Sequence, residues 1–174
     1  MRGAGIYCRN NSSGLFQNCI IEGNDSDGDG GGIFCESGAQ PVFRNCVITR
    51  NGGMPPGCGV YLSAESSPVF IYCTIADNPW GAGIWWEEGS SPALTNCIVW
   101  GNGTPPPPGG LIKYSCIEGE AVRPGPGNLN ADPLFVKSTS DQGDPSAGWD
   151  YHLRPDSPCI DAGTSEGVAP TDIE

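Results

Sequence analysis

Four aromatic residues occupy matching positions of a repeated sequence pattern and could bind a sugar chain. They are Tyr7, Phe34, Tyr61 and Trp85. On consecutive rungs of one outer face they would form a ribbon about 15 Å long, near the span of a few sugar rings. Aromatic faces suit the apolar side of a pyranose, and the carboxylate of nearby Glu87 could bind hydroxyl groups. The alternative is a ladder of rings that only stabilises neighbouring strands.

An acidic loop after the first repeat has the spacing of a calcium ligand set. Asp25, Asp27 and Asp29 alternate with small residues in the run Asp-Ser-Asp-Gly-Asp-Gly. Carboxylate oxygens at alternating positions of a glycine-bent loop are what a hard cation needs. Glu36 occupies the twelfth position of a helical calcium-hand pattern, but an intervening strand would carry it roughly 13 to 17 Å from the loop. The sequence therefore predicts either a calcium site made by the three aspartates or a solvated acidic turn.

Residues that could cleave a polysaccharide are not paired in the sequence. Elimination of uronates needs a lysine or arginine base with a metal, and glycoside hydrolysis needs converging carboxylates. Arg44 and Arg50 fall outside the aromatic positions. The adjacent Glu87 and Glu88 would point to opposite sides if the strand continues. This pattern favours a non-catalytic protein over an enzyme.

The nine cysteines suit packing better than chemistry. Eight fall at positions expected to face a core, and Leu62 and Trp86 replace Cys8 and Cys35 in later repeats. A position that accepts leucine or tryptophan needs an apolar filler rather than a thiol. No cysteine pair, and no cysteine with the single histidine, has the spacing of a zinc or redox motif. We therefore expect unpaired cysteines.

These candidate residues are positioned by a repeat that begins with glycine four times. The repeats start at Gly5, Gly32, Gly59 and Gly83, which are 27, 27 and 24 residues apart. Self-similarity with this period is typical of a solenoid, in which each coil buries its apolar face against its neighbours. Helical periodicity is nearly absent, and short alternating runs predict three brief strands per coil. The predicted fold is an all-β parallel β-helix with about four full coils and a partial fifth.

Alternation within the strands predicts which residues face inward and which form corners. The inward columns are Ile6, Ile33, Val60 and Ile84 in the first strand, and Phe16, Phe43, Phe70 and Leu94 in the second. Asn18, Asn45 and Asn96 mark the bend into the third strand, where asparagine tolerates a left-handed backbone. Tyr72 takes this position in the third coil, and Cys116-Ile117 gives a shorter fifth copy of the third strand. The prolines at 105–108 replace the first strand of the fifth coil.

Composition limits the partners of such a protein. Asp and Glu outnumber Lys and Arg by 20 to 8, and the net charge of −12 repels phosphate backbones and anionic membrane surfaces. Nucleic acid is therefore not an expected partner. No apolar stretch approaches the roughly 20 residues that cross a bilayer, so membrane insertion is not expected either. The uncovered first coil would expose strand edges, which predicts end-to-end stacking on another molecule.

The repeat pattern over residues 3 to about 119 resembles the right-handed parallel β-helix proteins of bacterial surfaces, in the pectate-lyase-like superfamily. The tail is similar to the C-terminal module of the choice-of-anchor Q type, here cut short. That resemblance rests on Asp132-Pro133-Leu134-Phe135-Val136, Asp150-Tyr151-His152-Leu153, Ser157-Pro158-Cys159-Ile160-Asp161-Ala162-Gly163 and Thr171-Asp172-Ile173. It implies a right-handed solenoid over residues 1–119 and a loop-rich capping or anchor-like module over residues 120–174.

The resemblance also implies an exported, surface-attached protein, but it assigns no reaction, because β-helices support many functions. We expect a non-catalytic module, extracellular or on the bacterial cell surface. It would display a glycan- or protein-binding face, as an adhesin does, or act as a rigid spacer. The alternative is a fragment of a polysaccharide lyase or glycoside hydrolase that acts on acidic polysaccharide. Its partner would be a polysaccharide or a surface protein, with calcium as the candidate cofactor.

Overall fold

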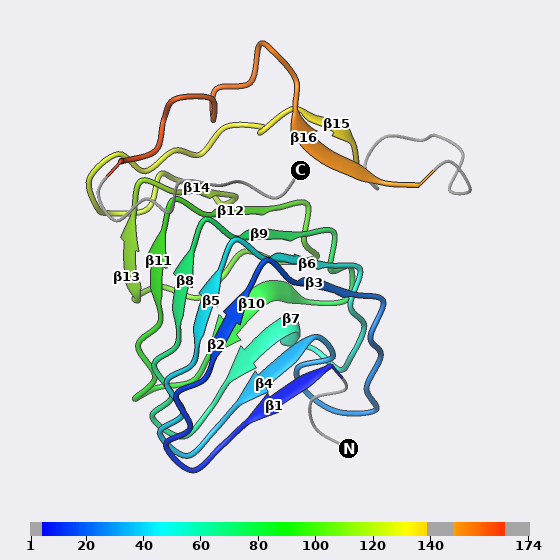
Figure 1. The fold of residues 1–174 in the computed structure, drawn as a ribbon, viewed down its shortest axis with the longest axis vertical. Helices are drawn as coiled ribbons and strands as arrows, with labels where there is room; N and C mark the ends of the chain where they lie inside the picture. Colours follow the sequence, from blue (N-terminus) through cyan, green and yellow to red (C-terminus); the bar gives the residue numbers. More distant parts are fainter. Residues whose placement is uncertain (1–4, 139–147, 166–174) are drawn as a thin grey trace.

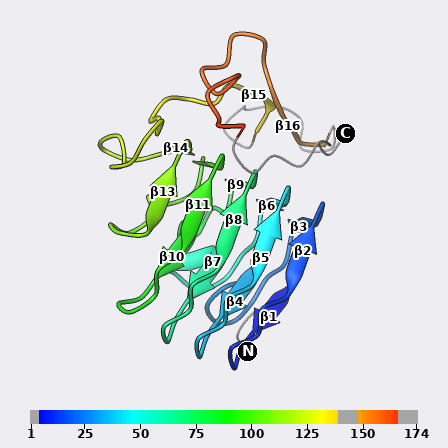
Figure 2. The same ribbon diagram turned by 60° about the vertical axis from the view of Figure 1, so that its left-hand side comes forward.

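The computed structural model describes residues 5–138 and 148–165 of the 174-residue chain. Sixteen short strands make up the regular structure of this part. Most of them stack into three parallel sheets around one core. A hairpin of β15 (Phe135–Lys137) and β16 (Asp150–Leu153) lies at the end of the stack, beyond β14 (Cys116–Ile117) (Figures 1 and 2). The all-β prediction is confirmed. Thr171 to Ile173, part of the tail resemblance, lie outside the described residues.

The three sheets of the solenoid are built from one strand of each coil. The first sheet contains β1 (Ile6–Cys8), β4 (Ile33–Cys35), β7 (Gly57–Leu62) and β10 (Ala82–Trp86). The second contains β2 (Leu15–Gln17), β5 (Val42–Arg44), β8 (Val69–Ile71), β11 (Ala93–Thr95) and β13 (Leu111–Lys113). The third contains β3 (Ile20–Glu22), β6 (Val47–Thr49), β9 (Thr74–Ala76), β12 (Ile98–Trp100) and β14 (Cys116–Ile117).

The number of coils agrees with the prediction. The first sheet has four strands, and the second and third have five each, so the fifth coil is partial. Where the fifth coil would add to the first sheet, only a single bridge forms, between Thr104 and Ala82. The prolines that follow Thr104 explain this, because proline has no N–H to donate to a neighbouring strand.

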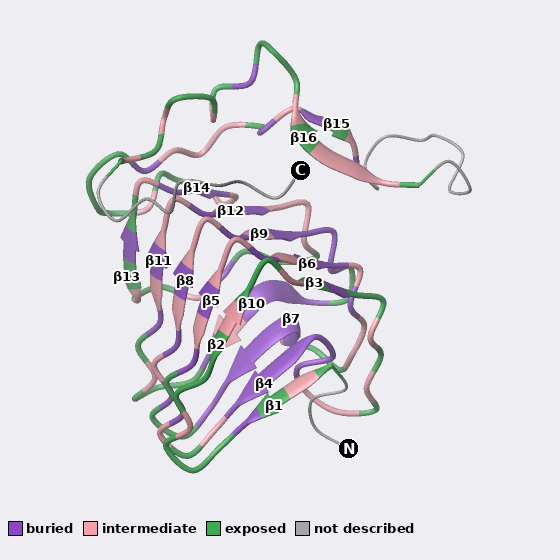
Figure 3. Ribbon diagram, viewed as in Figure 1, coloured by how far each residue is buried: buried purple, intermediate pink, exposed green. Residues whose placement is uncertain are grey.

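Stacked columns of apolar side chains fill the interior of the solenoid. Phe16, Phe43 and Phe70 stack nearly parallel, with ring centroids 4.9 Å and 5.1 Å apart. Phe43 and Phe70 are fully buried, as are Ile33, Val60 and Ile84 in the first sheet. Figure 3 shows this burial as a band that continues from coil to coil. The inward columns predicted from the sequence are confirmed.

The bend between the second and third sheets uses left-handed backbone in every coil. The φ angles are 54° at Asn18, 51° at Asn45, 55° at Tyr72, 54° at Asn96 and 49° at Tyr114. The Asn45 amide donates to Asn18 Oδ1 at 3.0 Å, so a side-chain hydrogen bond joins these two rungs. Tyr72 and Tyr114 adopt the same conformation without an amide side chain. The bend therefore requires the backbone geometry more than it requires asparagine.

A second asparagine ladder closes the coils on the far side of the third sheet. Asn51 Nδ2 donates to Asn78 Oδ1 at 3.2 Å, and Asn78 Nδ2 donates to Asn102 Oδ1 at 2.9 Å. The same oxygens accept backbone N–H groups of the coil before, and Asn51 and Asn78 are fully buried. Asn24 extends the ladder to the first coil. These bonds satisfy polar groups that would otherwise be buried without partners.

The fifth copy of the third strand is shifted by one residue from the predicted alignment. Cys116 pairs with Ile98, and Ser115 instead occupies the position of Cys97. Because side chains alternate between the two faces of a strand, this shift turns Cys116 outward and leaves Ile117 in the core. The prediction that Cys116 continues the inward cysteine column is therefore wrong.

The hairpin packs on the solenoid through polar contacts. It consists of β15 (Phe135–Lys137) and β16 (Asp150–Leu153), which pair antiparallel. The hydroxyl of Tyr151 donates to Asp77 Oδ2 at 3.0 Å and lies 2.5 Å from Thr49 Oγ1. Both partners belong to the third-sheet side of the solenoid. Residues far apart in the sequence thus join the tail to the coils.

Candidate functional site

The aromatic column lies on the outer face of the first sheet, as predicted. Phe34 pairs in register with Tyr7 and Tyr61, and Tyr61 pairs with Trp85. The Phe34 and Tyr61 rings stack with centroids 5.5 Å apart and planes 3° apart. Tyr7 meets Phe34 edge-on at 5.5 Å. The four residues therefore form the expected ladder on consecutive rungs.

The middle of the column is covered, so the expectation of a continuous exposed ribbon is wrong. Phe34 is 0% exposed and Tyr61 7% exposed, whereas Tyr7 is 43% exposed. Trp85 is half-buried. Glycine backbone packs closely against the column: a Cβ on Gly30, before β4, would lie 3.0 Å from the Cβ of Phe34, and one on Gly57, the first residue of β7, would lie 3.0 Å from Cδ2 of Tyr61. Only the two ends of the column are open to a ligand.

Each tyrosine of the column donates a hydrogen bond to a glutamate in the next coil. Tyr7 donates its phenol hydrogen to Glu36, and Tyr61 donates to Glu87 Oε1 at 2.7 Å. The hydrogen bond to Glu36 raises the pKa of Tyr7 above its ordinary value. At the rung where the ring is Phe34, which has no hydroxyl, the matching residue of the next coil is Ser63. The sequence signal of this pair is a tyrosine in one coil and a glutamate two residues after the matching position of the next coil, a pattern that catalytic spacing does not include.

The two open ends of the column differ in their charged neighbours. At the Tyr7 end, the Arg9 guanidinium lies over the ring, 5.7 Å from its centroid. At the Trp85 end, Glu87 and Glu88 are exposed. Trp80, in the turn before β10, is also 69% exposed but lies outside the repeated column. Sequence reasoning missed Trp80 because it lies outside the repeated aromatic position.

The acidic loop packs on the next coil and is not folded around a single point. Met54 N donates to the Gly28 carbonyl at 3.0 Å, and Asp25 Oδ1 accepts the Ser26 N–H at 3.0 Å. Asp25 and Asp27 are exposed and Asp29 is half-buried. Within residues 5–138 and 148–165, no three His, Cys, Asp or Glu side chains gather as metal ligands would. The structure therefore does not bring the three aspartates together.

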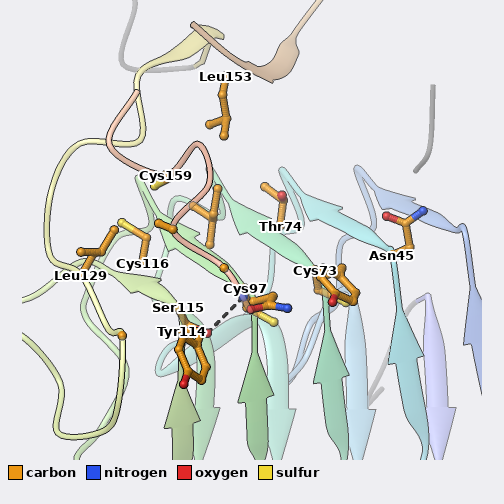
Figure 4. A pocket seen from close by; sticks show the side chains of 16 residues that line it. Asn45, Cys73, Thr74, Cys97, Tyr114, Ser115, Cys116, Leu129, Leu153 and Cys159 are labelled. Carbon is orange, nitrogen blue, oxygen red and sulfur yellow. Dashed lines mark hydrogen bonds between the residues drawn. The ribbon is translucent and has the colours of Figure 1, made fainter. Parts of the chain in front are cut away.

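A cavity of about 320 Å³ lies between the third sheet and the C-terminal segment (Figure 4). Tyr72, Asn96 and Tyr114 line it from the corner of the solenoid. Cys116 of β14 and Cys159 of the C-terminal segment line the same cavity. The sequence did not indicate this cavity, because it forms where the C-terminal segment packs on the coils, and the repeat pattern does not relate those residues.

All nine cysteines are free in the structure, as predicted. Cys46, Cys73 and Cys97 stack in the core, and their thiols donate to backbone carbonyls, as Cys73 does to Phe43 O at 3.5 Å. Burial raises the pKa of the Cys58 thiol. These contacts agree with cysteine acting as a small apolar filler.

The family model described as a right handed beta helix region matches residues 1–118, and the chain belongs to this family. The predicted right-handed β-helix is thereby confirmed. No curated protein and no solved structure matches the chain. Over the residues that the structure describes, no helix is long and apolar enough to span a membrane.

Proposed function

We propose that this chain is a non-catalytic module of an exported β-helix protein on the bacterial cell surface, and that it binds a polysaccharide. The observation that carries the proposal is the open end of the aromatic column. There the half-buried Trp85 lies two residues from the exposed carboxylate of Glu87, on a strand held in a packed sheet. A rigid strand is a good support for a binding site, because little conformational entropy is lost on binding.

The chemistry of this end suits a sugar ring. The exposed part of the indole would pack against the apolar face of a pyranose, and Glu87 would accept hydrogen bonds from its hydroxyls. Glu87 already accepts the Tyr61 phenol, which fixes its side chain while leaving other lone pairs free. A surface protein that presents an aliphatic or sugar-like group is the alternative ligand.

Calcium is the proposed cofactor of the acidic loop. Support comes from the alternating Asp25, Asp27 and Asp29 and from the glycines between and after them. Binding would have to rearrange the loop, because the three carboxylates are not gathered in the ligand-free fold. Calorimetry with calcium tests this, and the absence of heat at millimolar calcium would overturn it.

One observation favours the enzymatic alternative. Glu36 and Glu87 follow matching strands, and the backbone hydrogen bonds of Glu36, Ser63 and Glu87 place the backbones of the two glutamates two rungs apart, or about 10 Å. That is near the separation of roughly 6.5 to 9.5 Å in inverting glycosidases. The phenol bound to each carboxylate argues for a structural role instead. If the wild type cleaves a polysaccharide, and Glu36→Gln and Glu87→Gln each abolish that cleavage, the enzymatic alternative is supported.

A glycan array of the folded chain, with and without calcium, tests the binding proposal. We expect retention of a related set of polysaccharides, and loss of about tenfold in affinity for Trp85→Ala. Trp80→Ala is the matched control, because it removes an exposed tryptophan outside the column and should bind as the wild type does. Equal affinity of the folded wild type and Trp85→Ala would refute the site, and a blank array would favour a spacer.

A further inference from the structure

We propose that Cys116 and Cys159 form a disulfide bond when the protein meets an oxidising environment, and that this bond fastens the C-terminal segment to the last coil of the solenoid.

Cys116 has been turned out of the core column by the one-residue shift of β14. Ser115 takes the position next to Cys97, and its hydroxyl accepts the Cys97 N–H at 3.0 Å. Cys116 itself pairs with Ile98 and is only 3% exposed. It is absent from the core cluster that contains Ile117. Its burial therefore comes from the segments packed on the outer face.

Cys159 is held over this position by hydrogen bonds on both sides of it. Before it, Ser157 Oγ donates to Pro133 O at 2.6 Å and accepts the Cys159 N–H at 3.1 Å. After it, Asn96 exchanges two hydrogen bonds with Thr164, each 2.9 Å long. The segment is thus held by Pro133 of the preceding loop on one side of the thiol and by Asn96 of the solenoid on the other.

The two thiols are neighbours. They line the same cavity, and Figure 4 shows both sulfur atoms at its edge. A hydrogen bond between them lowers the pKa of Cys116 and raises that of Cys159. Cys159 is half-buried beside an open cavity, whereas the stacked Cys46, Cys73 and Cys97 lie in the core, out of reach of an oxidant.

The reaction is exchange with a small-molecule disulfide, such as oxidised glutathione. One of the two cysteines, as its thiolate, attacks one sulfur of the reagent, which breaks the reagent's S–S bond and releases one thiol. The other cysteine then loses its proton and attacks the first cysteine's sulfur in this mixed disulfide, which releases the second thiol. In total, two protein thiols are oxidised to one disulfide and one reagent disulfide is reduced to two thiols.

The test is peptide mapping of the full chain after equilibration with oxidised glutathione and alkylation of the remaining thiols. Trypsin cleavage after Lys113 and Lys137 places Cys116 and Cys159 on separate peptides that contain no other cysteine. We expect these two peptides to be joined, with a mass about 2 Da below their sum. Recovery of both as alkylated thiols, or their joining to other cysteines, would overturn the proposal.

A stability measurement gives an independent readout. Oxidation of the wild type should raise Tm by on the order of 5 °C, because the bond restricts the unfolded chain. Cys116→Ser should lose this redox dependence. The control Cys19→Ser removes a half-buried cysteine that does not line the cavity, and it should keep the full shift. If Cys116→Ser does not fold, Cys159→Ser serves in its place.

Discussion

Single side chains stabilise this protein through the matching side chain one coil away. Asn51 illustrates this: its amide donates to Ile21 O at 2.9 Å and to Asn78 Oδ1, while its oxygen accepts two bonds from Asn24. The Tyr61–Glu87 pair follows the same rule on the outside of the first sheet. A substitution therefore affects polar groups in two or three coils at once.

Buried asparagines of the ladder should contribute more to stability than the asparagine at its half-buried end. Asn51→Ala should lower the free energy of unfolding by about 3 kcal/mol, because it leaves several buried polar groups without partners. Asn24→Ala, at the half-buried end of the same ladder, should cost about 1 kcal/mol. Urea denaturation measures both. Equal losses would mean that burial does not determine the strength of the ladder.

At the scale of elements, the sequence predicted what repeats and missed what does not. Ile33, Val60 and Ile84 marked the core because burial recurs with each coil, and Asn18 and Asn45 marked the corner because its backbone conformation recurs. The shift at Cys116 was missed, because the residue type suggested one register and the pairing of Ile117 with Val99 imposed another. The covering of Phe34 was also missed, since it depends on how a glycine-rich turn folds back.

The docking of the C-terminal segment on Asn96 can be tested with two matched variants. Asn96→Gly keeps the left-handed backbone but removes both bonds to Thr164, so amide hydrogen exchange of residues 157–164 should rise at least tenfold. Asn45→Gly, which removes only the bond to Asn18, should leave this segment protected. Unchanged exchange in Asn96→Gly would show that other contacts hold the segment.

The docking of the hairpin predicts a loss of stability at alkaline pH. Burial, reinforced by the Asp77 carboxylate, raises the pKa of Tyr151 above its ordinary 10.0. The unfolded chain therefore loses this proton before the folded chain does. The contribution is complete below about pH 10 and declines as pH rises beyond it. Between pH 8 and 11 the Tm of the wild type should fall further than the Tm of Tyr151→Phe. If the plots of Tm against pH are parallel for the two proteins, the ionisation of Tyr151 does not affect stability.

At the scale of the whole molecule, the solenoid is one stack with two different ends. One end carries the C-terminal segment and the hairpin (Figure 1). At the other, Leu15 and Ile20 are exposed on β2 and β3, and the Tyr7 end of the aromatic column is open. Within the part of the chain that the structure describes, β2 pairs only with β5 and β3 only with β6, and a strand edge of this kind favours pairing with another strand.

End-to-end stacking through the first coil predicts self-association. Sedimentation velocity of the purified chain should show a fraction of dimer that increases with protein concentration. Ile20→Lys should weaken this association by placing a charge at the contact. Leu111→Lys is the control, since Leu111 is equally exposed on the fifth coil. An unchanged monomer at all concentrations would contradict stacking through this end.

We propose that the solenoid binds a polysaccharide without cleaving it. The most direct measurement is electrophoresis through gels that contain acidic polysaccharides, combined with assays for reducing ends and unsaturated products in the same incubations. We predict retardation of the wild type, less retardation of Trp85→Ala, and no product. Product release that depends on Glu36 and Glu87, or migration unaffected by every polysaccharide, would contradict the claim.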